Sequence, residues 1–274
     1  MSDTQPQQGP GEDAGPVRLE VDAGVAWVRL HRPEAMNSLD LGLKQALLAT
    51  LQRVADDPGA RCVVLTGDGR AFCVGQDLKE HVRSLADPDS RLSTTVTEHY
   101  NPIVLLLATM AKPVVAALNG VAAGAGLSFA LACDVRVAAR SAGLNTAFAG
   151  IALSCDSGAS WALPRLVGPA RAKELLLLPR TVPAEEALAM GLVTQVVDDD
   201  ALEATVRELA TTLAAGPTLA YGSIRRAVAF SAGVGLADAL DNEAQLMALT
   251  GASSDHRAAV DAFLAKRPPE YTGR

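Results

Sequence analysis

A run of 21 uncharged residues between Lys112 and Asp134, PVVAALNGVAAGAGLSFALAC, limits what this chain of 274 residues can fold into. On length alone the run could span a membrane. Asn119, Gly120, Gly124 and Gly126 interrupt it, and residues of these types mark turns. The run therefore predicts a buried strand, a tight turn and a buried helix in a globular protein, and no membrane segment.

Strand-like runs alternate with helical patterns through most of the chain. Apolar and β-branched residues dominate these runs, which cover residues 25–30, 61–66, 113–118 and 134–138. Residues 38–55 have helical spacing, and Ser38 or Asp40 can cap the start of that helix. The alternation predicts an α/β fold.

Three parts of the chain differ in pattern. Residues 1–16 are rich in Pro, Gly and Gln and lack the basic and apolar stretches of a signal peptide, so a disordered tail is expected. Residues 17–200 carry the α/β pattern and predict the core. Residues 201–274 have helical patterns, and we expect them to form a helical oligomerisation region.

Charge and cysteine usage exclude several classes of function. The formal net charge of −7 comes without a dense Lys/Arg cluster, so no nucleic-acid partner is expected. The four cysteines are widely spaced and form no CxxC pair, which indicates reduced thiols in a cytoplasmic protein. The histidines have no partners at metal-ligand spacing, and no bound metal is expected.

Two glycine-containing loops follow predicted strands. RCVVLTGDGRAFCVGQDL runs from a strand into a turn at Gly75, and LNGVAAGAGLSFALACD runs from a strand into a helix that begins around Gly124–Gly126. Amides in such turns and at helix starts are free donors. Two donors from separate loops can stabilise one oxygen that gains negative charge, as in an oxyanion hole. The alternative is that these glycines only form turns.

The segments HRPEAMNSLD, AFCVGQDLKE and KPVVAALNGVAAGAG resemble the enoyl-CoA hydratase/isomerase (crotonase) superfamily, in register from about Val17 to Arg274. Within it, VGQDL, HYNPIV and AFLAKRPPEYTG are most similar to the phenylacetate-pathway isomerases, which act on 2-(1,2-epoxy-1,2-dihydrophenyl)acetyl-CoA. The resemblance implies a spiral of ββα units with a helical C-terminal trimerisation region, a homotrimer or homohexamer, and an acyl-CoA thioester as substrate. It implies no cofactor, because coenzyme A is part of the substrate.

The resemblance assigns the two oxyanion-hole amides to Gln76 and Ala125. It also implies that the thioester lies beside neighbouring residues of the same two loops, namely Asp77, Leu78, Lys79 and Gly124. The two glutamates that handle water in hydratases correspond here to Ser128 and Phe148. Neither side chain can act as the required acid or base, since serine without a partner is a poor base and phenylalanine does not titrate.

Asp156 occupies the position where the resemblance places the single acid of double-bond isomerases. One carboxylate can remove a proton from one carbon and return it to another. Its apolar surroundings predict a raised pKa, because burial disfavours the charged form. The alternative reading is that Asp156 caps the helix SGASWALPRL, a position that suits aspartate.

Coenzyme A needs a cation for its 3′-phosphate, and the resemblance points to Arg32 and, from a neighbouring subunit, Lys266. His99 is either a solvated histidine or, as in related enzymes, part of the acyl pocket, which Phe148 also lines. Residues 78–99 are polar and predict a mobile loop over that pocket. Aryl-CoA dehalogenases of the superfamily have a tryptophan at the position of Phe148, which disfavours that activity here.

Three functions therefore remain open. The favoured one is an acyl-CoA isomerase that uses Asp156 as a proton shuttle on a 3-enoyl-CoA or an epoxyphenylacetyl-CoA. The second is a 2-enoyl-CoA hydratase, which Ser128 and Phe148 disfavour. The third is a non-catalytic acyl-CoA-binding protein, which would not call for a buried acid.

Overall fold

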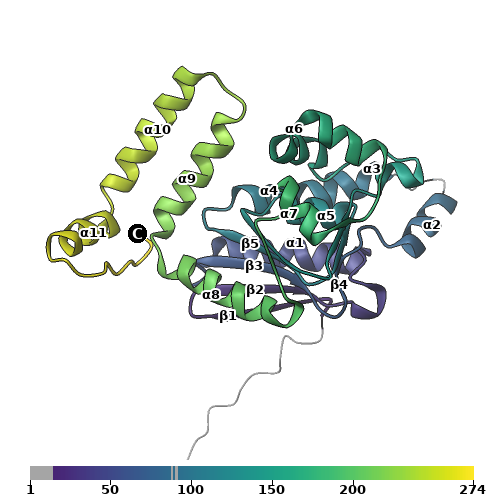
Figure 1. Ribbon diagram of the computed structural model, residues 1–274, viewed down its shortest axis with the longest axis horizontal. Coiled ribbons are helices and arrows are strands. Elements are labelled where there is room, and N and C mark those ends of the chain that lie inside the picture. Colours follow the sequence, from purple (N-terminus) through teal and green to yellow (C-terminus); the bar gives the residue numbers. More distant parts are fainter. Residues whose placement is uncertain (1–14, 88, 90–91) are drawn as a thin grey trace, which may run out of the picture.

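The computed structural model describes residues 15–87, 89 and 92–274 of the chain. The predicted disordered tail, residues 1–16, falls almost entirely outside the described residues. Figure 1 shows a core built around two β-sheets and a helical arm that projects from it. The arm contains the C-terminal helices and lies on the opposite side of the core from helix α2 (Leu78–Ala86).

The strands of the core are divided between two sheets. The larger sheet has the order β1 (Val17–Asp22), β2 (Val25–Leu30), β3 (Cys62–Gly67), β5 (Val114–Leu118), β7 (Val135–Ala139) and β10 (Gln195–Val197). The smaller has the order β4 (Ala71–Cys73), β6 (Val121–Ala123), β8 (Gly143–Asn145) and β9 (Val182–Pro183). All neighbours are parallel except β1 with β2 and β8 with β9. Strands β3 and β5 are buried throughout, as their apolar runs require of central parallel strands.

Strands β3 to β8 alternate between the sheets, so that β3, β5 and β7 enter the larger sheet and β4, β6 and β8 the smaller one. Each pair leads into helix: α2 after β4, α5 (Ala125–Leu131) after β6, and a short turn and α6 (Ala159–Leu177) after β8. This arrangement confirms the predicted α/β spiral of ββα units. The uncharged run contains the predicted turn at Asn119-Gly120 and the predicted helix, and β6 adds a second strand that the pattern did not indicate.

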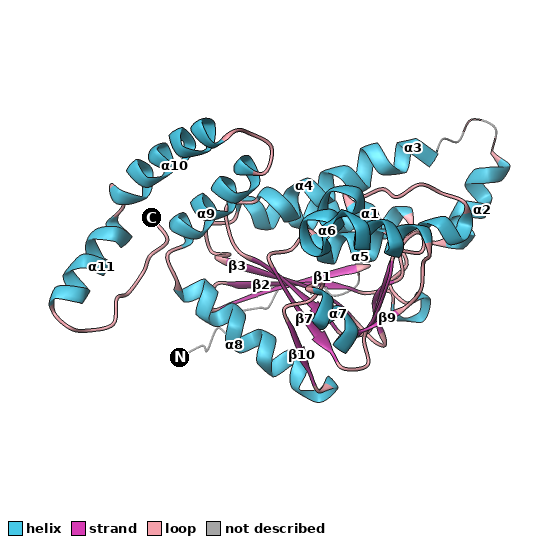
Figure 2. Cartoon of the chain, turned by 45° about the horizontal axis from the view of Figure 1, so that its top comes forward, coloured by secondary structure: helices cyan, strands magenta, loops and turns pink. Residues whose placement is uncertain are grey.

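Helices cover both faces of the larger sheet. Helix α1 (Leu41–Asp56) packs on β1, β2 and α4 (Asn101–Thr109), while α8 (Leu202–Ala215) packs on β3, β5 and β7. Figures 1 and 2 place α8 on the opposite face of the sheet from α1 and α4. Asp40 caps α1, as one of the two predicted candidates, by accepting a hydrogen bond of 2.9 Å from the Leu43 amide.

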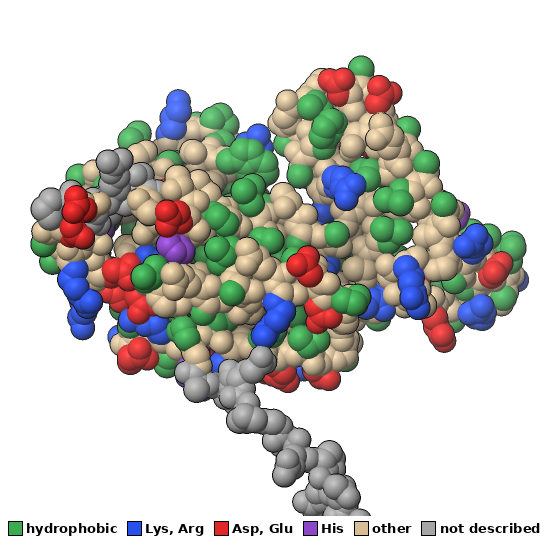
Figure 3. All heavy atoms as spheres, turned by 180° about the vertical axis from the view of Figure 1, so that it is seen from behind, with side chains coloured by type: hydrophobic (Ala, Val, Ile, Leu, Met, Phe, Trp, Pro, Cys, Tyr) green, Lys and Arg blue, Asp and Glu red, His purple; other side chains and the backbone are tan. Residues whose placement is uncertain are grey.

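The short helix α7 (Ala184–Met190) joins β9 to β10, and three helices form the arm: α9 (Thr218–Ser231), α10 (Leu236–Gly251) and α11 (Ser254–Leu264). Arg225 ties α9 to the core, because its guanidinium donates to Asp134 Oδ1 at 2.8 Å and to the Leu107 carbonyl at 2.6 Å. The chain end folds back on α11, where the Thr272 and Gly273 amides donate to the buried Asp255 carboxylate. In Figure 3 a notch separates the arm from the core.

The prediction of a mobile loop at residues 78–99 is wrong for most of the described residues of this segment. Residues 78–86 form α2, residues 92–95 form α3 (Leu92–Thr95), and residues 96–100 form a π-helical turn that leads into α4. Residues 88 and 90–91 lie outside the described residues. Asp77 starts α2 by accepting hydrogen bonds from the Lys79 and Glu80 amides, a local capping signal that outweighs the polar composition.

No described helix combines the length and the hydropathy that a membrane span requires. The uncharged run is divided among β5, β6 and α5. Its side chains are mostly buried between the two sheets and their covering helices.

Replacing Gly126 with alanine tests the contact between α5 and β4. An added methyl group would lie 2.3 Å from the Cys73 carbonyl oxygen, so we expect the Gly126→Ala variant to lose at least about 1–3 kcal/mol of unfolding free energy in urea. Gly251→Ala is the matched control, because that helical glycine has no atom within 4 Å of the added methyl, and alanine there favours the helix by up to about 1 kcal/mol. Equal stability of the two variants would contradict this account.

Candidate active site

The backbone N–H of Gln76 points away from Leu39, the residue with which Gln76 forms a β-bridge. Leu39 forms a parallel bridge with Gln76, in which the Leu39 amide donates to the Gly75 carbonyl at 2.8 Å and the Asp77 amide donates to the Leu39 carbonyl at 3.2 Å. In such a bridge the N–H of the middle residue points to the opposite side. Among the described residues, the Gln76 amide has no acceptor, and it remains available to a ligand.

The Ala125 amide belongs to the first turn of α5 and also lacks an acceptor among the described residues. The two loops lie against each other. A methyl group placed on Gly75 would come within 3.5 Å of the Ala125 nitrogen and 2.9 Å of the Ala123 carbonyl oxygen. Glycine is needed at Gly75 for this reason and for its φ of +83°. The predicted pair of donors is thus brought together, although their roles stay a prediction.

Asp156 is half-buried just before α6. Its Oδ1 accepts a hydrogen bond of 2.7 Å from the Ser157 hydroxyl. Burial raises the pKa of the Asp156 carboxyl, and the Ser157 hydrogen bond lowers it by less, so the pKa stays above its ordinary value, as predicted. Ser157 itself is buried and has a left-handed φ of +52°, a kind of backbone strain that clusters at functional sites.

The alternative reading of Asp156 as a helix cap is wrong. Helix α6 begins at Ala159, its cap residue is Gly158, and no side chain caps it. Asp156 contributes only its backbone carbonyl, which accepts from the Ala159 amide at 3.0 Å. The left-handed conformations of Ser157 and Gly158 separate the carboxylate from the helix, which the sequence pattern alone does not reveal.

Tyr100 contacts the Gln76 side chain. Burial raises the pKa of the Tyr100 hydroxyl, and the negative charge of Asp156 raises it further. The same hydroxyl donates to Gln76 Oε1. Helix α6, which follows Asp156, packs on α5, whose first residue is Ala125.

An apolar cavity of about 490 Å³ is lined in part by Ser157 and Gly158, the two residues that follow Asp156. It runs between α4, α5, α6 and α9, and its lining includes Val104, Leu105, Ser128, Ser157, Gly158 and Trp161. A space of this kind fits the acyl part of a thioester.

Side chains at the two hydratase glutamate positions carry no acid–base group. The Ser128 hydroxyl is buried and donates to the Gly124 carbonyl at 3.2 Å. The Phe148 ring is buried on the short helical turn Phe148–Ile151. Gly124 itself faces open space, since an added methyl group there would meet no atom within 4 Å.

Asp77 and Arg32 bind each other. Arg32 donates to Asp77 Oδ2 at 3.2 Å and lies 3.2 Å from Asp40, and Ser38 donates to the same Asp77 oxygen at 3.0 Å. Burial would raise the pKa of the Asp77 carboxyl, but its hydrogen bonds and the Arg32 charge lower it. The predicted phosphate contact of Arg32 would therefore be shared with two carboxylates. Leu78 and Lys79 are exposed on α2.

His99 is not a solvated histidine. It is 9% exposed in the π-helical turn, and its Nδ1 is buried without a partner among the described residues. It thus remains a candidate for the acyl pocket. Lys266 is exposed after α11 in the arm, and its predicted contact with a neighbouring subunit stays a prediction. The described residues contain no group of three or more His, Cys, Asp or Glu side chains placed to hold a metal ion.

Three further residues at this site were missed by the sequence analysis: Lys44, Glu80 and Tyr100. Lys44 carried a signal, because it lies on the buried face of α1 with Leu43, Leu47, Leu51 and Val54. A charge on the apolar side of an amphipathic helix is unusual and marks a buried polar contact. Glu80 and Tyr100 carried no such signal.

The chain is similar to known proteins over almost its whole length. The family model described as enoyl-CoA hydratase/isomerase matches residues 20–274. The chain is 43% identical to the 1,2-epoxyphenylacetyl-CoA isomerase of Escherichia coli strain K12, over 93% of this chain and 97% of that protein. It is 44% identical, over 94% and 98%, to a Rhodobacter capsulatus protein named a probable enoyl-CoA hydratase.

A solved structure from Mycobacterium abscessus, described as an enoyl-CoA hydratase/isomerase, superimposes with a TM-score of 0.90. That protein is 45% identical, and the match covers 94% of this chain and all of the other. The chain belongs to the enoyl-CoA hydratase/isomerase family.

Proposed function

We propose that this enzyme is an acyl-CoA isomerase in which Asp156 carries the proton. The observation that supports this most is the raised pKa of the half-buried Asp156 carboxyl, in a site where the hydratase glutamate positions hold Ser128 and Phe148. A single base with a pKa nearer the operating pH suits proton transfer without added water.

The proposed reaction shifts a double bond in a 3-enoyl-CoA. The Asp156 carboxylate removes a proton from C2, and the C–H electron pair delocalises onto the thioester oxygen and C4. The Gln76 and Ala125 amides donate to that oxygen while it is negative. Asp156 then returns the proton to C4, so that the double bond moves from C3=C4 to C2=C3 and no atom is gained or lost.

An epoxidised phenylacetyl-CoA is the second acyl group that we propose. The name of the Escherichia coli relative supports it, and an apolar cavity of about 490 Å³ can hold a ring of that size. The reaction needs no cofactor besides the coenzyme A of the substrate. We propose that Lys266 of another copy meets the 3′-phosphate.

Asp156→Asn tests the proton carrier. The amide cannot accept the proton, so we expect the conversion of a 3-enoyl-CoA to the conjugated 2-enoyl-CoA, followed by absorbance, to fall about 10²–10⁴-fold. Asp200→Asn, at an exposed acid, is the matched control and should keep the wild-type rate. Hydration of crotonyl-CoA should be negligible in all three proteins. Brisk hydration that survives Asp156→Asn would instead favour the hydratase alternative.

Ser157→Ala tests how the Asp156 pKa is set. The hydroxyl lowers the pKa of the carboxyl by donating to Oδ1, so its removal should raise that pKa further. The base is active when deprotonated, and the acidic limb of kcat/KM against pH should therefore move to higher pH. Ser160→Ala, at an exposed serine of α6, should leave the limb in place. An unmoved limb in the Ser157 variant would show that Asp156 does not govern it.

We also propose that the enzyme is a homotrimer or homohexamer formed through the arm. Large apolar side chains of the arm are exposed in the single chain, among them Leu236, Met247, Phe263 and Leu264. Exposed apolar surface of this extent marks an interaction site. We further propose a cytoplasmic location, which the four free cysteines support.

Light scattering should give a particle mass of three or six times the 28.3-kDa chain. Phe263→Glu places a charge on a side chain that is 82% exposed in the single chain, so the variant should give smaller particles. Glu243→Gln, at an exposed position of α10, serves as the control. A wild-type mass of one chain would overturn the proposed assembly.

A further inference from the structure

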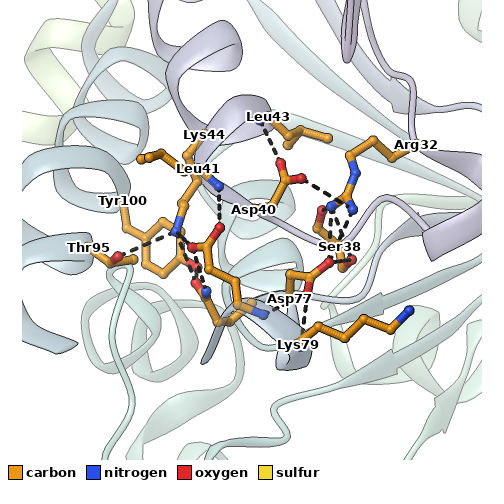
Figure 4. A network of polar contacts seen from close by, with 12 residues as sticks. Arg32, Ser38, Asp40, Leu41, Leu43, Lys44, Asp77, Lys79, Thr95 and Tyr100 are labelled. Atoms are coloured by element: carbon orange, nitrogen blue, oxygen red, sulfur yellow. Dashed lines mark hydrogen bonds and ion pairs between the residues drawn. The ribbon is translucent and has the colours of Figure 1, made fainter. Parts of the chain in front are cut away.

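A fully buried ammonium group, that of Lys44, lies in a network of polar contacts (Figure 4). Lys44 of α1 is 0% exposed, and its Nζ donates to Glu80 Oε1 at 2.5 Å. It also lies 3.4 Å from the Thr95 hydroxyl and 3.5 Å from Gln76 Oε1. All three donor positions of the ammonium group are therefore used inside the protein.

The Gln76 carboxamide is held at both ends. Its Oε1 accepts from the Tyr100 hydroxyl and from Lys44, and its Nε2 donates to Glu80 Oε1 at 3.1 Å. These contacts come from α1, α2 and the π-helical turn, so three separate elements fix one side chain. Figure 4 shows the Lys44 and Tyr100 side chains reaching the same group of polar contacts.

Glu80 completes the network from the other side. Its second oxygen accepts from the Leu41 amide at the start of α1 at 2.5 Å. Burial alone would raise the pKa of the Glu80 carboxyl, but hydrogen bonds from Lys44 and Leu41 and the Lys44 charge lower it. Glu80 is thus held as a carboxylate that pairs with Lys44.

Stability alone is a weak reason for such a pair. The free energy needed to remove two charges from water offsets much of their attraction. Apolar residues of similar volume often stabilise a protein as well as such a pair, or better. What the network does provide is a fixed orientation. The backbone on both sides of Gln76 is bonded to Leu39, and the side chain is bonded to Tyr100, Lys44 and Glu80.

We propose that Lys44, Glu80 and Tyr100 are positioning residues, which hold Gln76 so that its backbone N–H points at the thioester oxygen of the substrate. This inference rests on the oxyanion role given to the Gln76 amide in the proposed function.

The test uses 4-(dimethylamino)cinnamoyl-CoA, a probe whose absorbance shifts to the red when its thioester carbonyl is polarised. Wild-type protein should shift the probe on binding. Lys44→Met and Tyr100→Phe should lose at least half of that shift, while the Kd of the probe changes by less than about threefold. Tyr100→Phe keeps the ring that packs edge-on against Phe129, with centroids 5.9 Å apart.

Turnover of a 3-enoyl-CoA gives a second readout. Losing one oxyanion donor typically costs about 10²–10³-fold, and a misdirected donor costs part of this. We expect kcat to fall about 10–100-fold in Lys44→Met and Tyr100→Phe, with KM nearly unchanged. A variant that only loosened the fold would instead lower the melting temperature without changing the probe shift of the folded fraction.

Lys112→Met is the matched control for removing a buried lysine. Lys112 is 6% exposed and donates to the Val54 and Asp57 carbonyls, at the other end of α1 from Lys44. It should destabilise the protein and leave the probe shift intact. If Lys44→Met does not fold, Tyr100→Phe and Glu80→Gln carry the test, since Glu80→Gln keeps an acceptor for Gln76 Nε2 and removes the charge.

The outcomes separate this inference from the proposed function. A full red shift in Tyr100→Phe, Glu80→Gln and folded Lys44→Met would overturn the inference, and so would a wild-type protein that binds the probe without any shift. A wild-type protein that shifts the probe but isomerises no acyl-CoA would overturn the proposed function instead. In that case, loss of the shift in the variants would still support the positioning role.

Discussion

The packing of Gly126 against the Cys73 carbonyl is the contact on which the candidate site depends. No side chain fits there, because even a methyl group would lie 2.3 Å from that oxygen. The contact brings the start of α5 onto β4, so that the Gly75 turn and the Ala125 amide meet. The chain crosses from the larger sheet to the smaller one between β3 and β4 and again between β5 and β6. The loops that follow these crossings carry the two free amides, which can face one oxygen.

Asp156 differs from the other acids near the site in what surrounds it. Asp77 is bound by Arg32 and Ser38, and Glu80 is bound by Lys44, and in both cases the partners lower the pKa of the carboxyl despite burial. Asp156 has only a neutral hydroxyl as a hydrogen-bond donor among the described residues, and burial raises its pKa. The same chemical group is therefore held ionised in Asp77 and Glu80 and made more basic in Asp156.

Local signals in the sequence were sufficient for most of the elements. The buried runs of β3 and β5, the Asp40 cap of α1 and the glycine-rich start of α5 lie where the pattern predicts. The failures have a common cause, because each depends on conformation rather than composition. The Asp77 cap makes a helix of a polar segment predicted to be a loop, and left-handed Ser157 and Gly158 separate Asp156 from the helix it was expected to cap.

The sequence by itself determined the α/β alternation and the family, and it predicted the positions of the two amides and the acid, because periodicity, glycine spacing and motif residues are local properties. Only the tertiary structure decided how these positions are held. The hydrogen bonds of the Gln76 side chain are made with Lys44, Glu80 and Tyr100, which lie on separate helical elements. Such contacts form only when packing has excluded water, because buried polar groups must then form their hydrogen bonds with one another.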